Sequence, residues 1–208
     1  MTTAFQYIFD NAESISIDRK AVVAQTVTRD QTLRSVSRGG KVWRFDVKLP
    51  DGIPWSTARP YIEAIDYADR YTVGNVQINN AGYNAWLTPY QGNAVNSTGF
   101  YSNVKLGNTS ITLSASPTIS SGNKFVRGDL IQLGPNGKVY SVAADVPYTS
   151  NIVTLNRPII DANVANVNLQ VGPAVTWRVV CTELPTWTIM SRDQVSWSGS
   201  FKFMEYLL

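Results

Sequence analysis

Hydrophobic and polar residues alternate most regularly over residues 41–48. Trp43, Phe45 and Val47 share one face of an extended chain there, while charged residues occupy the positions between them. An alternation with a period of two is typical of a strand that buries one face and exposes the other. The segment is therefore predicted to be a half-buried β-strand, followed by a turn at Pro50 and Gly52.

Runs rich in β-branched and aromatic residues predict further strands. Their ranges are 22–28, 32–37, 72–78, 83–87, 175–183, 186–191 and 195–206. The first two are separated by Arg29-Asp30-Gln31, which predicts a hairpin. The last three are long and rich in Trp and Phe, and in this they resemble the N-terminal strands.

One segment has helical spacing instead. Its apolar residues recur at intervals of three and four, which predicts a helix between Pro54 and Tyr71. They are Tyr61, Ile62, Ile65 and Ala68. Ser56 or Thr57 is expected to cap the start, and Pro60 is expected in the first turn, where a missing N–H costs least.

The middle of the chain has a different pattern, with short strands between turns rich in Gly, Asn and Pro from about residue 100 to 169. Five short strands in this space predict a small OB-like barrel. Residues 88–93 and 161–168 are predicted to be the linkers on either side. The expected fold is mainly β with one short α-helix, in which a discontinuous β-sandwich (1–90 and 168–208) contains an inserted OB-like β-barrel (91–167).

Composition excludes several kinds of chemistry. The 208 residues include no histidine and one cysteine, Cys181. Catalytic triads that use histidine, imidazole metal sites and intrachain disulfides are therefore ruled out. Cys181 lies in an apolar run and is predicted to be a core thiol. We expect no enzyme activity, no cofactor and no metal.

The terminus and the hydropathy bear on localisation. No apolar run approaches the length of a membrane span, and the N-terminus lacks the pattern of a signal peptide. We expect a protein made in the cytoplasm that does not associate with a membrane.

Charge is unevenly distributed. Residues 19–48 contain eight basic and two acidic side chains, although the net charge of the whole chain is only +3. The predicted helix is rich in acids. The candidate assembly or channel residues are Arg29, Arg34, Arg38, Lys41, Arg44, Glu63, Asp66 and Asp69. The basic strip is interpreted as a solvated strand pair, a surface for nucleic acid or an acidic partner, or one half of a head-to-tail contact between identical copies.

Two other functions stay open at this point. The barrel could hold a cell-surface sugar, with Tyr101 or Tyr140 as the stacking residue. A carboxylate-based glycosidase would instead need two carboxylates about 5 to 10 Å apart across a cleft.

The chain also resembles the distal tail proteins of long-tailed bacteriophages, of the compact type with an inserted OB-like domain. The resemblance rests on residues 43–60, on 128–133 together with 138–142, and on the closing strand at 200–203. It implies a ring of six copies, at the distal end of the tail in the virion, that joins the tail tube to the tip or baseplate hub. DNA would pass through the central channel without sequence-specific binding. The resemblance implies no catalysis, and synthesis in the host cytoplasm.

Overall fold

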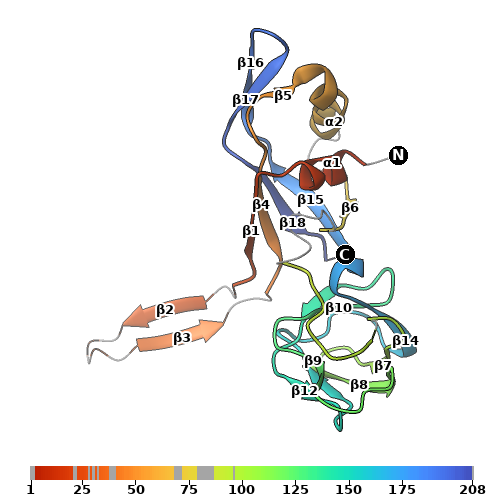
Figure 1. The fold of residues 1–208 in the computed structure, drawn as a ribbon. Helices are drawn as coiled ribbons and strands as arrows, with labels where there is room; N and C mark the ends of the chain where they lie inside the picture. The colour runs from red at the N-terminus through yellow and green to blue at the C-terminus, as the bar shows by residue number, and fades with distance from the viewer. Residues whose placement is uncertain are drawn as a thin grey trace.

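The computed structural model describes residues 3–20, 23–27, 29, 31, 33–37, 41–67, 72–78, 87–95 and 97–207; for 23–27 and 33–37 it describes the backbone alone. This part of the chain is mainly β, with two α-helices and several sheets (Figure 1). The helices are α1 (Ala4–Asp10) and α2 (Trp55–Tyr67), and Gly172–Ala174 forms a 3-10 turn. The strands outside the central segment are β1 (Ser14–Asp18), β2 (Val23–Val27), β3 (Leu33–Ser37), β4 (Arg44–Lys48), β5 (Ile53–Pro54), β6 (Gly74–Val76), β15 (Trp177–Glu183), β16 (Thr186–Met190), β17 (Gln194–Ser198) and β18 (Phe201–Glu205). Those of the central segment are β7 (Tyr101–Val104), β8 (Ser110–Ala115), β9 (Asn123–Phe125), β10 (Leu130–Leu133), β11 (Val139–Ser141), β12 (Val146–Pro147), β13 (Ile152–Thr154) and β14 (Val164–Val171).

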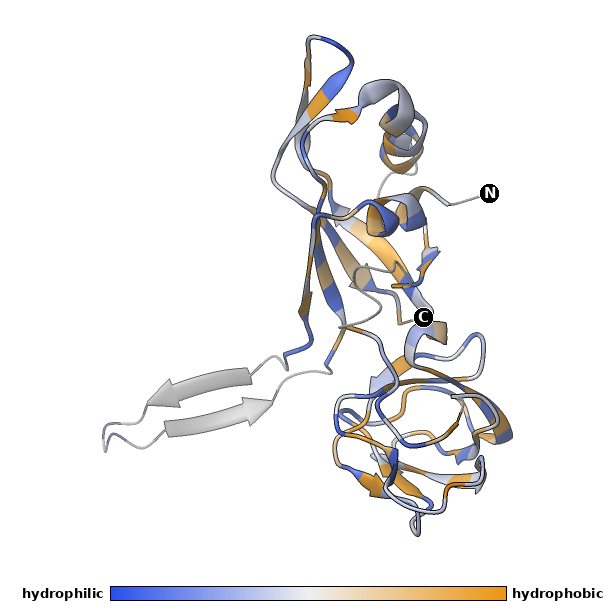
Figure 2. Ribbon diagram, in the orientation of Figure 1, coloured by the Kyte–Doolittle hydropathy of each residue, from blue (hydrophilic) through white to orange (hydrophobic). Residues whose placement is uncertain are grey.

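A five-stranded antiparallel sheet, in the order β1-β4-β18-β15-β6, forms the body outside the central segment. Hydrophilic and hydrophobic residues alternate along its strands, as Figure 2 shows. The predicted alternation is confirmed in β4, where Phe45 and Val47 are buried and Arg44 and Lys48 are exposed.

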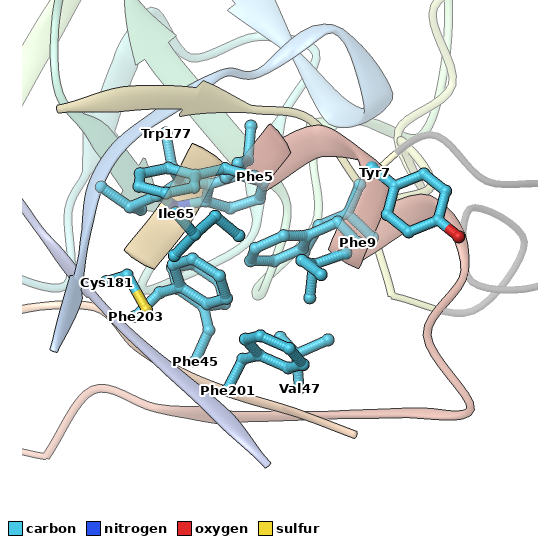
Figure 3. Packing of buried hydrophobic residues seen from close by; sticks show 14 of the residues in the cluster. Phe5, Tyr7, Phe9, Phe45, Val47, Ile65, Trp177, Cys181, Phe201 and Phe203 are labelled. Atoms are coloured by element: carbon cyan, nitrogen blue, oxygen red, sulfur yellow. The ribbon is translucent and has the colours of Figure 1, made fainter. Parts of the chain in front are cut away.

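The apolar face of this sheet packs against the helices. Figure 3 shows Phe5 and Phe9 of α1 lying against the aromatic residues of the sheet. The ring centroids of Phe9 and Phe45 are 5.6 Å apart, and those of Phe5 and Phe203 are 5.3 Å apart. Cys181 is buried in the same cluster, so the prediction of a core thiol is confirmed.

The expectation of a single helix is wrong, because α1 precedes the sheet. Thr3 caps it by accepting a hydrogen bond from the N–H of Gln6. Four of its seven residues are buried apolar or aromatic side chains. An apolar segment of seven residues is too short to show helical periodicity, and contact with the sheet and with Tyr61 of α2 stabilises it.

Helix α2 is confirmed, but its start differs from the prediction. It begins at Trp55, so Pro60 is its sixth residue and lies beyond the first turn. Ser56 and Thr57 are inside the helix and do not cap it. The N–H of Ser56 donates to Asp193, which lies 137 residues further along the chain.

Within the central segment, a six-stranded sheet in the order β11-β10-β14-β7-β8-β13 curls into a half-barrel (Figure 1). Its two ends meet, because the N–H of Asn156 donates to Ser141 and the N–H of Ala143 donates to Thr154. A second hydrophobic cluster, which includes Phe100 and Phe125, fills the interior.

The return linker predicted at 161–168 is wrong. Residues 164–171 form β14, which pairs with β7 on one side and β10 on the other. Four of the eight residues of β14 are exposed, including the apolar residues Val164 and Ala165 at its start. A pattern that depends on burial therefore does not reveal this strand.

Two hairpins extend beyond the five-stranded sheet, one at each end of it (Figure 1). Strands β2 and β3 pair with each other as predicted and form a separate two-stranded ribbon, which we call the arm. Strands β16 and β17 pair with each other, and β17 also pairs with β5. Of the strand pair predicted at 72–78 and 83–87, the first strand is present as β6. The second lies almost entirely within residues 79–86, which are outside the described part.

Candidate assembly surfaces

The arm continues the β1–β4 pair of the sheet. The last pairing between those strands joins Asp18 to Arg44, and the first pairing in the arm joins Val23 to Ser37. Residues 19–41 contain six basic side chains and one acidic side chain. Of the predicted basic strip, Arg29 and Arg34 lie on the described part of the projecting arm, and Arg19 and Lys41 lie at its root.

The root of the arm is held on both sides. The guanidinium of Arg19 lies 5.1 Å from the ring centroid of Trp43, and burial lowers its pKa. The carbonyl of Lys41 accepts a hydrogen bond of 2.8 Å from Arg157 of the central segment. The indole N–H of Trp43 donates to the carbonyl of Val139 at 2.9 Å. These contacts fix the point at which the arm leaves the body.

A buried ion pair lies beside this root. Both nitrogens of the Arg157 fork contact the carboxylate of Glu205, at 2.6 and 2.7 Å, and both side chains are almost completely buried. Arg157 also donates to the carbonyl of Val139. The two residues are 48 positions apart, so sequence patterns give no signal that they pair.

The predicted acidic residues lie at the other end of the body. Glu63 and Asp66 are exposed on α2, and within the described part of the chain their only ion pair joins Glu63 to Arg59 at 4.0 Å. In Figure 1, α2 is at the end of the sheet opposite the arm. Opposite charges thus occupy well-separated surfaces of one chain.

The outer face of the five-stranded sheet is open and forms a groove of about 470 Å³. Asp18, Asp46, Arg44 and Lys202 line it, together with Phe45 and Thr182 among others. The Lys202 ammonium contacts Glu183 at 2.8 Å, and this hydrogen bond raises the pKa of Lys202. The carboxylates of Asp18 and Asp46 are only half-buried in this open groove. A carboxyl group that acts as a general acid instead has its pKa raised in a desolvated pocket. The arrangement suits ion pairing across an interface.

The six predicted site residues that the structure describes do not form one site. Arg29 is exposed between β2 and β3, and Arg34 is on β3. Lys41 is half-buried at the arm root, and Arg44 is exposed in the groove. Arg38 and Asp69 lie outside the described residues. Sequence reasoning did not identify Arg19, Trp43, Arg157 or Glu205 as the residues that hold the arm, because their contacts join distant segments.

Tyr140 is unavailable as a stacking surface for a sugar. Its side chain is fully buried, and its hydroxyl donates to Asp161 at 2.6 Å. Burial and this hydrogen bond raise the pKa of Tyr140. Tyr101 is half-buried at the start of β7.

In the described ranges, no group of three or more histidine, cysteine or acidic residues is placed to hold a metal. Neither α1 nor α2 is long and apolar enough to cross a membrane. Comparisons with protein-family models and with curated proteins found no match to this chain.

Proposed function

We propose that this chain is a structural subunit of a ring in the virion, of six copies, at the distal end of a phage tail. The ring joins the tail tube to the tip or baseplate hub, and DNA passes through its centre without sequence-specific binding. The chain is not an enzyme in this proposal.

The observation that carries the proposal is the basic arm fixed at its root, with the acidic face of α2 at the opposite end of the body (Figure 1). A ring needs two different complementary surfaces on every copy, placed so that each copy contacts the next. The charges of residues 19–41 and of Glu63 and Asp66 are complementary in this sense.

The finer architecture belongs to the same proposal. Residues 1–90 and the chain after β14 form the β-sandwich ring domain, and residues 91–171 form an OB-like barrel that faces outward. The barrel is extended past the expected boundary at 167 because residues 168–171 of β14 pair within the central sheet. The hydrogen bond from the N–H of Asn156 to the carbonyl of Ser141 joins the two ends of the curled sheet, and this supports a barrel. The separate hydrophobic cluster within residues 100–171 supports an inserted domain.

Light scattering and negative-stain images of the purified protein test the proposal. We expect concentration-dependent assembly into rings. A protein that stays monomeric at high concentration, with no ring in assembled particles, contradicts it.

Charge reversal tests the role of the arm. The double variant Arg29→Glu/Arg34→Glu is expected to weaken assembly, because it removes the attraction to the acidic surface. Lys105→Glu/Arg127→Glu makes the same change in net charge at exposed barrel positions and serves as the control. If the arm variant still assembles but DNA passage fails, the arm residues line the channel instead of the subunit interface.

A further inference from the structure

Strand β16 is the outer strand of the sheet β16-β17-β5, and its only ladder partner in the described part is β17. Its five residues, Thr-Trp-Thr-Ile-Met, are uncharged. Ile189 and Met190 are 52% and 41% exposed. Proteins ordinarily protect an edge strand with charges, a proline or a bulge. An unprotected edge of this kind is suited to pairing with another strand.

The hydrogen bonds of β17 show which peptide groups of β16 point outward. The carbonyl of Val195 accepts from Gly52 at 2.8 Å, and the N–H of Trp197 donates to Asp51 at 2.9 Å. Both groups therefore face β5 and not β16. In an antiparallel ladder, residues opposite such positions also point away from their partner.

The residues opposite Val195 and Trp197 are Ile189 and Trp187. Their N–H and C=O groups consequently point to the open edge. A strand added at this edge would form main-chain hydrogen bonds with Trp187 and Ile189, as in β-strand addition.

This edge is fixed in position before any partner arrives. The carbonyl of Asp193, in the turn after β16, accepts from Trp55 at 2.8 Å, and its carboxylate accepts from Ser56 at 3.0 Å. The rings of Trp187 and Trp55 stack with centroids 5.9 Å apart. A preformed edge loses little conformational entropy when it binds.

We propose that the open edge of β16 accepts the β2–β3 arm of a second copy of this chain, which extends the three-stranded sheet to five strands. The inference rests on the proposed function and names the acceptor of the arm. A two-stranded ribbon is marginally stable alone and gains from a third strand. The arm carries basic side chains, and the exposed acids Glu63 and Asp66 of α2 lie on the helix that contacts β16. The arm and β16 are also at opposite ends of the body, as a head-to-tail contact requires (Figure 1).

The variant Ile189→Pro tests this contact directly. It removes an N–H that points to the open edge and leaves the ladder between β16 and β17 intact, and proline is tolerated on edge strands. The matched control Ile189→Thr shortens the side chain but keeps the N–H. Ring formation is measured by light scattering, with folding of each variant checked by circular dichroism.

We expect the wild type and Ile189→Thr to form rings and Ile189→Pro to stay a folded monomer. Rings formed by Ile189→Pro as readily as by the wild type would overturn the inference and leave the proposed function standing. Failure of the wild type itself to assemble would contradict the proposed function as well. A closed dimer in place of a ring would indicate that β16 pairs with β16 of the second copy, and would also overturn the inference.

If Ile189→Pro does not fold, amide hydrogen exchange of the wild type tests whether the arm pairs with β16. The amides of Trp187 and Ile189 are expected to exchange more slowly in the ring than in a monomeric variant from which the arm is deleted. Equal exchange rates in the two states would overturn the inference.

Discussion

The Arg157–Glu205 pair is the polar contact that links three parts of the molecule. Arg157 follows β13, Glu205 ends β18, and the carbonyl of Lys41 at the arm root shares the same guanidinium. A buried carboxylate that loses its partner, or a buried guanidinium that loses its acceptor, retains the cost of desolvation. This pair is therefore a sensitive position for substitution.

Glu205→Gln should lower the free energy of unfolding by about 3 to 5 kcal/mol, because it leaves the Arg157 charge buried without a counter-charge. Urea unfolding measures the change. Glu183→Gln breaks the exposed pair with Lys202 and should leave stability nearly unchanged. Similar losses in the two variants would show that burial does not set the strength of the pair.

Asp129 shows how a buried carboxylate can be positioned without a cation. Its two oxygens accept from the N–H groups of Gln91 and Val126, at 2.9 and 2.8 Å, and fix the segment before β7 to the turn before β10. Burial raises the pKa of Asp129, and the two hydrogen bonds reduce this effect without cancelling it.

Because the folded state binds the Asp129 proton more tightly than the unfolded state, this residue stabilises the fold at low pH. The contribution is complete below the ordinary carboxyl value of 3.8 and is lost as pH rises through the raised value. The stability of the wild type relative to Asp129→Asn should therefore fall as pH rises from 3.8 toward neutrality. Urea unfolding over a pH series measures the difference, and a flat or rising difference would contradict the assignment.

At the scale of elements, the start of α2 depends on a hairpin that is distant in sequence. Asp193 adopts a left-handed conformation, with φ of 59°, and directs its carboxylate at the first turn of the helix. An aspartate or asparagine tolerates this backbone better than most residues. The cap and the hairpin turn are thus provided by one side chain.

Asp193→Ala should lower the free energy of unfolding by about 1 kcal/mol or more, because it removes the cap and places alanine at a positive φ. Asp193→Asn keeps an acceptor oxygen and tolerates the backbone conformation, so a smaller loss is expected. Thermal unfolding followed at a helical circular-dichroism wavelength compares the two. Equal losses would indicate that the carboxylate charge, and not the cap geometry, is decisive.

At the scale of the whole molecule, the central segment and the five-stranded sheet have separate hydrophobic cores but also contact each other. Leu130 and Val139 of the central segment belong to the hydrophobic cluster of the sheet and helices. The ammonium of Lys138 donates to the carbonyl of Tyr206 at 3.0 Å, and burial lowers the pKa of Lys138. The two parts are therefore expected to unfold together.

Fluorescence and circular dichroism can test this cooperativity, because all six tryptophans lie outside residues 91–167. Tryptophan fluorescence therefore reports on the chain outside the central segment, and far-ultraviolet circular dichroism reports on the whole chain. The two urea midpoints should coincide in the wild type and separate in Glu205→Gln. Separate midpoints in the wild type would show that the contacts do not couple the two parts.

Local sequence patterns determined the elements in which buried and exposed residues alternate at a regular spacing. The alternation around Phe45 predicted β4 with the correct buried face, and helical spacing around Ile62 predicted α2. The apolar run around Cys181 predicted its burial, and the turn at residues 29–31 predicted the hairpin of the arm. Periodicity succeeds here because each residue reports the side on which its own element meets the core.

Only the tertiary structure decided which of these elements meet. It placed α1 on the sheet, Asp193 on the start of α2, β14 in the half-barrel, and Arg157 against Glu205. It also separated the basic arm from the acidic helix and left the edge of β16 open. The physical reason is that each of these features depends on contacts between segments tens of residues apart, and the sequence near either partner has no periodicity that depends on the other.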